Sequence, residues 1–108
     1  MRVSRETRRM NVRADLRKQL RENGMDTHLW LDLIEDYMKF WDLKEELQKS
    51  IRTKGAMVTV ENGKQRFYKR NDAVVELPKV SKRMTDILDK LKIQVAEIKD
   101  EGEGDDDV

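Results

Sequence analysis

Residues 30–41 have the sequence WLDLIEDYMKFW and hold both tryptophans, one of the two tyrosines and one of the two phenylalanines of the chain. This stretch must therefore supply much of the hydrophobic core. Its apolar residues recur every three or four positions, as on an α-helix, but they also spread round most of the helix surface. A helix that is apolar on more than one face needs cover on more than one side. We expect neighbouring subunits to provide that cover and to form an oligomer interface at Trp30, Leu31, Ile34, Tyr37, Met38 and Trp41.

Length and composition exclude several classes of protein. The chain has 108 residues, of which 42% are charged and 37% hydrophobic, so its core is thin. Small domains of this kind are only marginally stable as monomers and are often stabilised by oligomerisation. Without cysteine it can form no disulfide, thiolate nucleophile or cysteine-based zinc site. It has no run of about 18 apolar residues, and its basic N-terminus lacks the apolar segment of a secretory signal. We expect one small domain with tails and no membrane partner.

The net charge of +1 conceals a strong separation of charge along the chain. Residues 1–23 carry eight basic and three acidic side chains, whereas residues 100–108 carry six acidic side chains and no basic one. A basic head and an acidic tail on a nearly neutral body indicate two different charged partners, or one segment masking the other.

Residues 1–24 are predicted to form a basic N-terminal helix or arm that ends at Asn23-Gly24. Its apolar stripe has only three residues, Val12, Leu16 and Leu20, which are too few for stable independent packing. We interpret its basic residues as contacts to the phosphates of a nucleic acid, with a solvated charged face as the alternative. These residues are Arg2, Arg5, Arg8, Arg9, Arg13, Arg17, Lys18 and Arg21.

The long helix is predicted to begin after Asp26 or Thr27 and to end near Thr53, before Gly55. The apolar period then changes to two, and Asn62-Gly63 separates two strand-like runs, which predicts a small β-hairpin over residues 56–69. The basic residues of this hairpin are either a second DNA contact or the charged edge of an exposed turn. They are Lys64, Arg66, Lys69 and Arg70.

Asn71-Asp72 is predicted to cap a further helix, with a kink or a fresh start near Lys79 because Pro78 lies too deep for a first turn. This helix has a narrow apolar stripe that suits an antiparallel hairpin with the long helix. The stripe consists of Val80, Met84, Ile87, Leu88, Leu91, Val95 and Ile98. Residues 25–99 are thus predicted to be a helical-hairpin oligomerisation core, and the acidic, glycine-spaced residues 100–108 a disordered tail.

No pattern in the sequence supports catalysis. His28 is the single histidine, and there is no Walker loop, Ser/His/Asp order or HExxH sequence. Carboxylates stand beside lysines at helical spacing, as in Glu45 and Lys49, where they form solvated pairs. We therefore expect no enzymatic activity, no cofactor and no metal site.

The ordered set of motifs over about residues 25–93 resembles the small subunit of phage terminase, in the short-chain branch of tailed phages and prophages. Trp30, Tyr37 and Trp41 match in the first helix, followed by Gly55-x-x-Val58 and Asn62-Gly63. Asn71-Asp72-Ala73-Val74, ELPKVSK over residues 76–82 and Met84-x-x-Ile87-Leu88-x-x-Leu91 complete the match. The family usually has proline after the asparagine, where this chain has Asp72, a residue equally suited to a helix start.

The resemblance implies a mainly α fold that assembles as a homo-oligomeric ring larger than a dimer. It implies a non-enzymatic packaging factor in the cytoplasm of the bacterial host, which binds double-stranded viral DNA and recruits and regulates the large ATPase–nuclease subunit. The acidic tail would then bind the large subunit or compete with DNA for the basic head. Two alternatives stay open: a generic oligomeric DNA-binding regulatory protein, and a protein-interaction adaptor.

Overall fold

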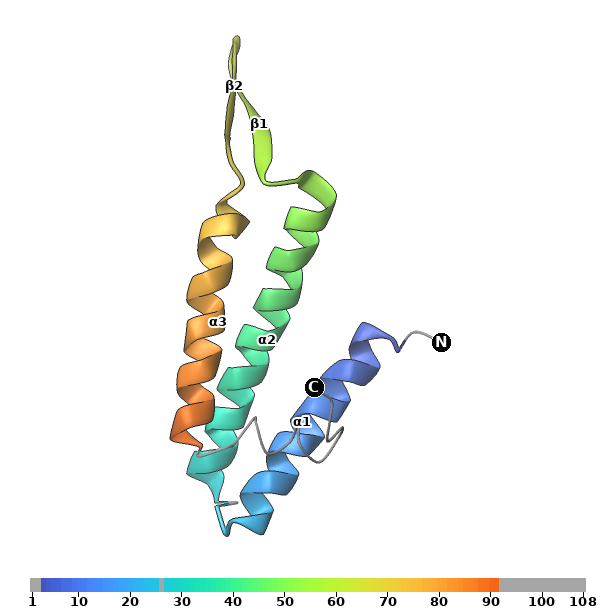
Figure 1. Cartoon of the computed structure of the whole chain (residues 1–108), viewed down its shortest axis with the longest axis vertical. Coiled ribbons are helices and arrows are strands. Elements are labelled where there is room, and N and C mark those ends of the chain that lie inside the picture. Colours follow the sequence, from blue (N-terminus) through green and yellow to red (C-terminus); the bar gives the residue numbers. More distant parts are fainter. Residues whose placement is uncertain (1–2, 26, 92–108) are drawn as a thin grey trace, which may run out of the picture.

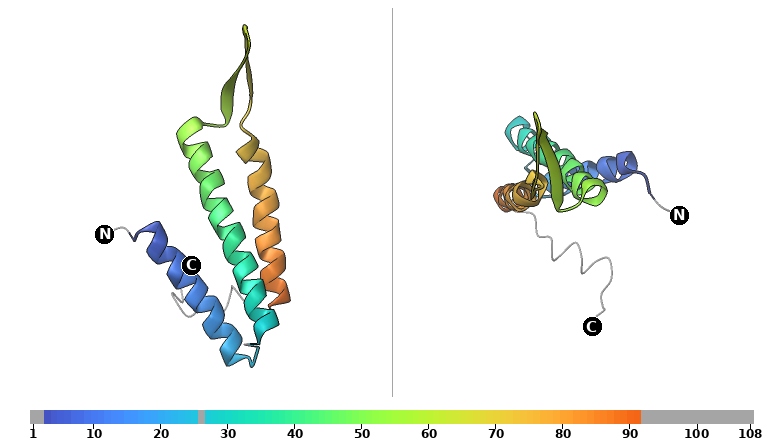
Figure 2. Two further views of the ribbon diagram at one scale, coloured as in Figure 1. Left: turned by 180° about the vertical axis from the view of Figure 1, so that it is seen from behind. Right: turned by 90° about the horizontal axis from the view of Figure 1, so that it is seen from above.

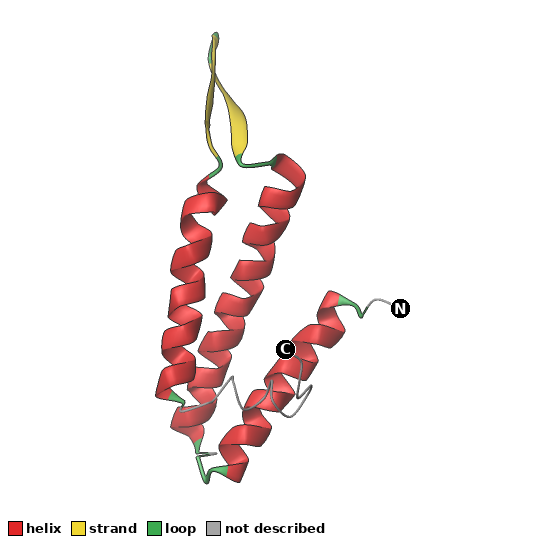
Figure 3. Ribbon diagram, in the orientation of Figure 1, coloured by secondary structure: helices red, strands yellow, loops and turns green. Residues whose placement is uncertain are grey.

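The computed structural model describes residues 3–25 and 27–91. In chain order it contains α1 (Arg5–Glu22), α2 (His28–Lys54), β1 (Met57–Asn62), β2 (Gln65–Arg70) and α3 (Asp72–Lys90). Helices α2 and α3 lie side by side and antiparallel, and the β-hairpin that joins them projects beyond their ends (Figures 1 and 3). Helix α1 meets α2 at the end of the helical hairpin that is remote from the β-hairpin. From there towards the N-terminus of α1, the two helices diverge (Figure 2). The predicted helical hairpin with a β-hairpin insert is confirmed.

One hydrophobic cluster joins all three helices. Its buried members are Leu16 and Leu20 from α1, Ile34, Met38 and Trp41 from α2, and Val80, Met84, Ile87 and Leu91 from the end of the chain that follows the β-hairpin. The predicted stripe on α3 is confirmed as far as Leu91, and its remaining members, Val95 and Ile98, lie outside the described residues. The core therefore sits at the end of the helical hairpin remote from the β-hairpin.

Helix α1 corrects the expectation that neighbouring subunits must cover the second face of α2. Leu16 and Leu20 are buried against the cluster, so α1 of the same chain provides this cover although its apolar stripe is short. Ile34 and Met38 are fully buried within one chain, and Trp41 is 8% exposed. Trp30, Leu31 and Tyr37 are only half-buried. Of the six predicted interface residues, these last three keep surface that another subunit could contact.

The helix ends follow local sequence signals. Thr27 is the N-cap of α2, and Gly55 ends this helix with a φ of 85°, a backbone conformation that glycine adopts without strain. Ser4 caps α1 by accepting a hydrogen bond from the Thr7 N–H at 3.1 Å. These findings confirm the predicted ends of the long helix.

The β-hairpin occupies residues 57–70, one residue later than predicted. Asn62 pairs with Gln65, so Gly63 and Lys64 are the central residues of the turn, in place of the predicted Asn62 and Gly63. Gly63 has a φ of 63°, which both favoured hairpin turns require at the first central position. The asparagine thus ends the first strand and the glycine begins the turn.

Asn71 fixes the junction between α2, the β-hairpin and α3. Its side-chain oxygen accepts a hydrogen bond from the Ala73 N–H at 3.0 Å, which confirms the predicted cap. Its amide nitrogen donates to the Gly55 carbonyl at 3.0 Å and to the Ser50 hydroxyl at 3.1 Å. The buried side chain thereby ties the end of α2 to the start of α3.

The predicted fresh start near Lys79 is wrong, because α3 continues through Pro78 as one helix. Proline removes a single backbone hydrogen bond from the helix. Ala73 and Val80, on either side of it, are both buried and hold the two parts of the helix against their neighbours. Within residues 3–25 and 27–91, no helix has the length and apolar character needed to cross a membrane.

Candidate nucleic-acid interface

The basic side chains of α1 divide into two groups that lie along different parts of the helix. Four arginines in its N-terminal half form ion pairs with carboxylates of α2. The nitrogen–oxygen distances are 2.7 Å for Arg5–Glu46, 2.9 Å for Arg8–Glu45, 2.8 Å for Arg9–Asp42 and 2.7 Å for Arg13–Glu35. Half of the eight predicted DNA-binding residues of the head are therefore engaged with acidic groups of the same chain.

Two of these pairs have the forked geometry in which a guanidinium donates two hydrogen bonds to one carboxylate. Arg9 donates to both oxygens of Asp42, at 2.8 and 3.1 Å, and Arg8 donates to both oxygens of Glu45, at 2.9 and 3.3 Å. The Arg8 guanidinium also lies over the Trp41 ring, 5.5 Å from its centroid. A phosphate can accept the same pair of hydrogen bonds from a guanidinium. These arginines could therefore bind DNA phosphates with the geometry that they now use for carboxylates.

The second group, Arg17, Lys18 and Arg21, occupies the C-terminal half of α1. Within the part of the chain that the structure describes, none of the three forms an ion pair. A groove along α1 is lined by Arg17 and Arg21 together with Arg9 and Arg13. These four arginines recur every four residues, so they form a row along one face of the helix. Arg2, the remaining predicted residue of the head, lies outside the described residues.

The pairing shifts the pKa of four of these side chains, Arg8, Arg9, Glu45 and Glu46. The hydrogen bond from Arg8 is the largest influence on Glu45 and lowers the pKa of its carboxyl, and the hydrogen bond from Arg5 does the same for Glu46. The pKa of Arg8 is raised by its hydrogen bond to Glu45, and that of Arg9 by its hydrogen bond to Asp42. Except for Glu45, these side chains are at least 31% exposed, and single ion pairs at exposed positions contribute little to stability.

The β-hairpin carries the second predicted set of basic residues. Arg66 pairs with Glu61 at 3.4 Å, and Lys69 pairs with Asp72 at 3.3 Å. Among the residues described, Lys64 and Arg70 form no ion pair. Every residue of β2 is exposed, including Phe67 and Tyr68, which are 47% and 76% exposed. Exposed aromatic and basic side chains together are typical of surfaces that bind nucleic acids.

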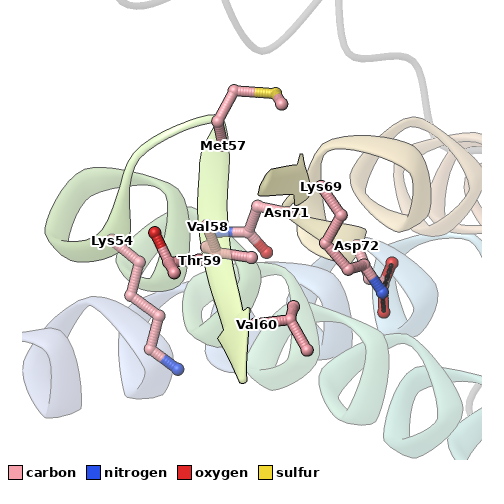
Figure 4. Close-up of a pocket in the computed structure, with 8 residues that line it drawn as sticks. All are labelled: Lys54, Met57, Val58, Thr59, Val60, Lys69, Asn71 and Asp72. Carbon is pink, nitrogen blue, oxygen red and sulfur yellow. Dashed lines mark hydrogen bonds and ion pairs between the residues drawn. The ribbon is translucent and has the colours of Figure 1, made fainter. Parts of the chain in front are cut away.

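The base of the hairpin has a hollow, which Figure 4 shows with its lining residues. Two of its polar side chains already have partners within the chain. The Lys69 ammonium is paired with Asp72, and the Asn71 amide is bonded to Gly55 and Ser50. The remaining lining residues are the apolar Met57, Val58 and Val60, together with Lys54 and Thr59. The hollow therefore lies at the helix–hairpin junction, where Lys69 and Asn71 are already engaged by groups of the same chain.

The two basic regions do not form one continuous surface within a subunit. The β-hairpin lies at one end of the helical hairpin, and α1 packs beside its other end (Figure 1). The sequence predicts DNA contacts for both regions but does not show how far apart they lie. It also gives no indication of the α2 partners Glu35, Asp42, Glu45 and Glu46. These acids are 22 to 41 residues away from their arginines in the chain, so no local signal connects them.

The residues described contain no group of three or more histidine, cysteine or acidic side chains placed to hold a metal ion. His28, the only histidine, is an exposed residue at the start of α2. The charged groups that could act at a functional site in the described residues are therefore the ion pairs and the basic side chains given above.

A family model described as "Phage terminase, small subunit" matches residues 11–100. The chain belongs to the phage terminase small subunit family. The match extends the resemblance seen over residues 25–93 into α1, so most of this basic helix belongs to the family region. Comparisons with curated proteins and with solved structures return no match. Terminase membership supports a role in phage DNA packaging.

The lowered pKa of Glu45 and Glu46 makes the contact between α1 and α2 depend on pH. Glu45 faces Arg8, Arg5 and Arg52, and Glu46 faces Arg5 and Lys49. Because pairing lowers the two pKa values, its contribution is complete above the ordinary glutamate pKa and disappears as pH falls through the lowered values. We predict that acidification below about pH 4 exposes the N-terminal half of α1 before the core unfolds. Amide hydrogen exchange should then rise at residues 5–13 while residues 34–41 stay protected; simultaneous loss of protection would contradict this.

Proposed function

We propose that this chain is the non-catalytic small subunit of a viral DNA-packaging terminase. It binds double-stranded genomic DNA as an oligomer in the cytoplasm of the bacterial host, and it recruits and regulates the large ATPase–nuclease subunit. The family match over residues 11–100 carries this proposal. The basic face of α1 supports it, because such a face suits a phosphate backbone.

The proposed DNA-binding surface begins with Arg17, Lys18 and Arg21. Within the described ranges these residues have no carboxylate partner, so a phosphate meets no competing group there. The α1 arginines that are paired with α2, and Arg2, extend the surface towards the N-terminus. The hairpin residues Lys64, Arg66, Lys69 and Arg70 form a separate contact, which reaches DNA from the other end of the subunit. Repetition of such patches around an oligomer strengthens binding although each patch is small.

The proposed oligomer interface is the remaining apolar surface of α2. Trp30, Leu31 and Tyr37 are half-buried, and Leu29 and Leu43 are 68% and 44% exposed. The apolar lining of a groove between α2 and α3 consists of Leu33, Phe40, Leu43 and Ile87. Its charged lining has both signs, with Asp36 and Asp86 beside Lys39, Arg83 and Lys90. A surface that carries both signs can be complementary to a copy of itself or to a neighbouring face of the same chain.

A closed ring predicts a particle larger than a dimer in solution, measured as molar mass by light scattering. Replacing Leu43 with glutamate places a charge in the proposed interface and should reduce the mass of the particle. Val75 is 40% exposed on α3, away from the groove, so Val75→Glu is a matched control that should leave the mass unchanged. A wild-type monomer at micromolar concentration would exclude the ring.

DNA binding through α1 predicts a steep dependence of affinity on salt. The variant Arg17→Ala/Lys18→Ala/Arg21→Ala should lower the slope of log affinity against log salt by roughly one unit for each phosphate that it no longer neutralises. The matched control is Lys49→Ala/Lys79→Ala/Lys82→Ala, which removes the same charge from exposed positions of α2 and α3. Equal slopes for the two variants would remove α1 from the DNA interface. A flat slope for the wild-type protein would favour the protein-interaction adaptor. A dimer that binds one short DNA sequence tightly would favour the generic DNA-binding regulatory protein.

The acidic tail is the proposed contact with the large subunit. Deleting residues 100–108 should abolish co-elution with the large subunit and leave the oligomer mass unchanged. A tail of equal length in which the six acids are replaced by asparagine and glutamine separates the effect of charge from that of length. Undiminished binding by the truncated chain would refute this contact. Tighter DNA binding after truncation would favour competition between the tail and DNA for the basic head.

A further inference from the structure

The two halves of α1 are attached to α2 by different forces. The C-terminal half buries Leu16 and Leu20 in the hydrophobic cluster. From Arg5 to Arg13 no residue is buried, and Met10 in the middle of this segment is 62% exposed. The four arginine–carboxylate pairs span just this segment. Apart from Val12, which packs half-buried against the cluster, polar contacts hold the N-terminal half of α1 to α2.

These pairs are accessible to solvent and to competing anions. The eight side chains that form them are between 19% and 59% exposed, and only Glu45 is below 30%. Exposed pairs of this kind are weak one by one and are screened by salt. By contrast, Leu20 is completely buried, so the C-terminal half of α1 has an anchor that salt does not loosen. Helix α1 is thus firmly held at one end and loosely held at the other.

The carboxylates of α2 occupy the place that phosphates would take on the same arginines. Glu35, Asp42, Glu45 and Glu46 present their oxygens as a strip along one side of α2, and Asp42 and Glu45 accept forked hydrogen bonds. A DNA strand offers a similar row of anionic oxygens. An arginine cannot direct the same fork at a carboxylate and a phosphate together, so DNA and α2 compete for it.

We propose that the N-terminal half of α1 is an electrostatic latch, in which the carboxylate strip of α2 holds four DNA-binding arginines until DNA phosphates replace it. The proposal rests on the proposed function, because it assigns these arginines to DNA. DNA first meets Arg17, Lys18 and Arg21, which lie on the anchored half of the helix. Its phosphates then take over Arg13, Arg9, Arg8 and Arg5, and residues 5–13 separate from α2.

The latch limits DNA affinity, because each arginine that is transferred must first leave a carboxylate. Neutralising the strip by Asp42→Asn/Glu45→Gln/Glu46→Gln should therefore tighten DNA binding. The matched control is Asp32→Asn/Glu76→Gln/Asp89→Asn, which adds the same net charge at exposed positions that make no pair with α1 and do not line the groove between α2 and α3. We expect the strip variant to bind at least about fivefold more tightly than the control, the lower end of typical coupling between sites.

The movement itself can be measured because the chain has no cysteine. Spin labels are attached to Met10→Cys in α1 and to Lys49→Cys in α2, both at exposed positions. Pulsed electron paramagnetic resonance then measures the distance between the two helices. Labelled chains are diluted with unlabelled chains, so that distances within one subunit dominate. The distance should lengthen when DNA is added to the otherwise wild-type protein, and it should already be long without DNA in the strip variant.

The outcomes separate the latch from the function on which it rests. If the strip and control variants bind DNA equally, or if saturating DNA leaves the distance unchanged, the latch is wrong while DNA binding stands. If the wild-type protein and both variants fail to bind DNA at low salt, the proposed DNA-binding function is wrong and the latch falls with it. If the strip variant alone binds DNA, the latch is supported and fully closed in the wild-type protein.

Discussion

The burial of two faces of α2 is the constraint on which the rest of this structure depends. Ile34 and Met38 have no exposed surface, and they share one cluster with leucines of α1 and with Val80, Met84 and Ile87 of α3. Because the chain is short and 42% charged, it has few apolar residues with which to provide this cover. It places most of them on α3 and only a short stripe on α1. Helix α3 is therefore packed along the hairpin, whereas α1 is packed over its last turns alone.

Because α1 has little apolar surface, its arginines make most of the contacts with α2 in its N-terminal half. Beyond the contacts of Val12, Leu16 and Leu20 with the cluster, α1 meets α2 through long polar side chains. Arginines reach across to carboxylates where the two helices diverge (Figure 2). The same residues are the ones proposed to grip DNA. In the proposed latch, intramolecular pairing and DNA binding use the same guanidinium groups, so a carboxylate and a phosphate compete for each arginine.

The β-hairpin is positioned by a different kind of interaction. A two-stranded hairpin is only marginally stable alone, and this one projects beyond the helices with an exposed second strand. Its base is fixed because the buried Asn71 side chain joins the end of α2 to the start of α3, and the Asn71 N–H donates to the Ala56 carbonyl at 2.7 Å. The basic and aromatic side chains of the hairpin therefore stand at a defined end of the molecule, away from the basic face of α1.

The sequence by itself determined the features that depend on neighbouring residues. Helical periods, the stop at Gly55, the cap at Asn71 and the change to period two all act within a few residues, and each appears in the structure. The sequence also carried the ordered motifs of the terminase family, which the match over residues 11–100 bears out. Only the tertiary structure decided that α1 of the same chain covers Ile34, Met38 and Trp41, and that Glu35, Asp42, Glu45 and Glu46 hold four arginines. Periodicity shows that a surface is apolar or charged, but what meets that surface is decided by the energy of packing distant segments together.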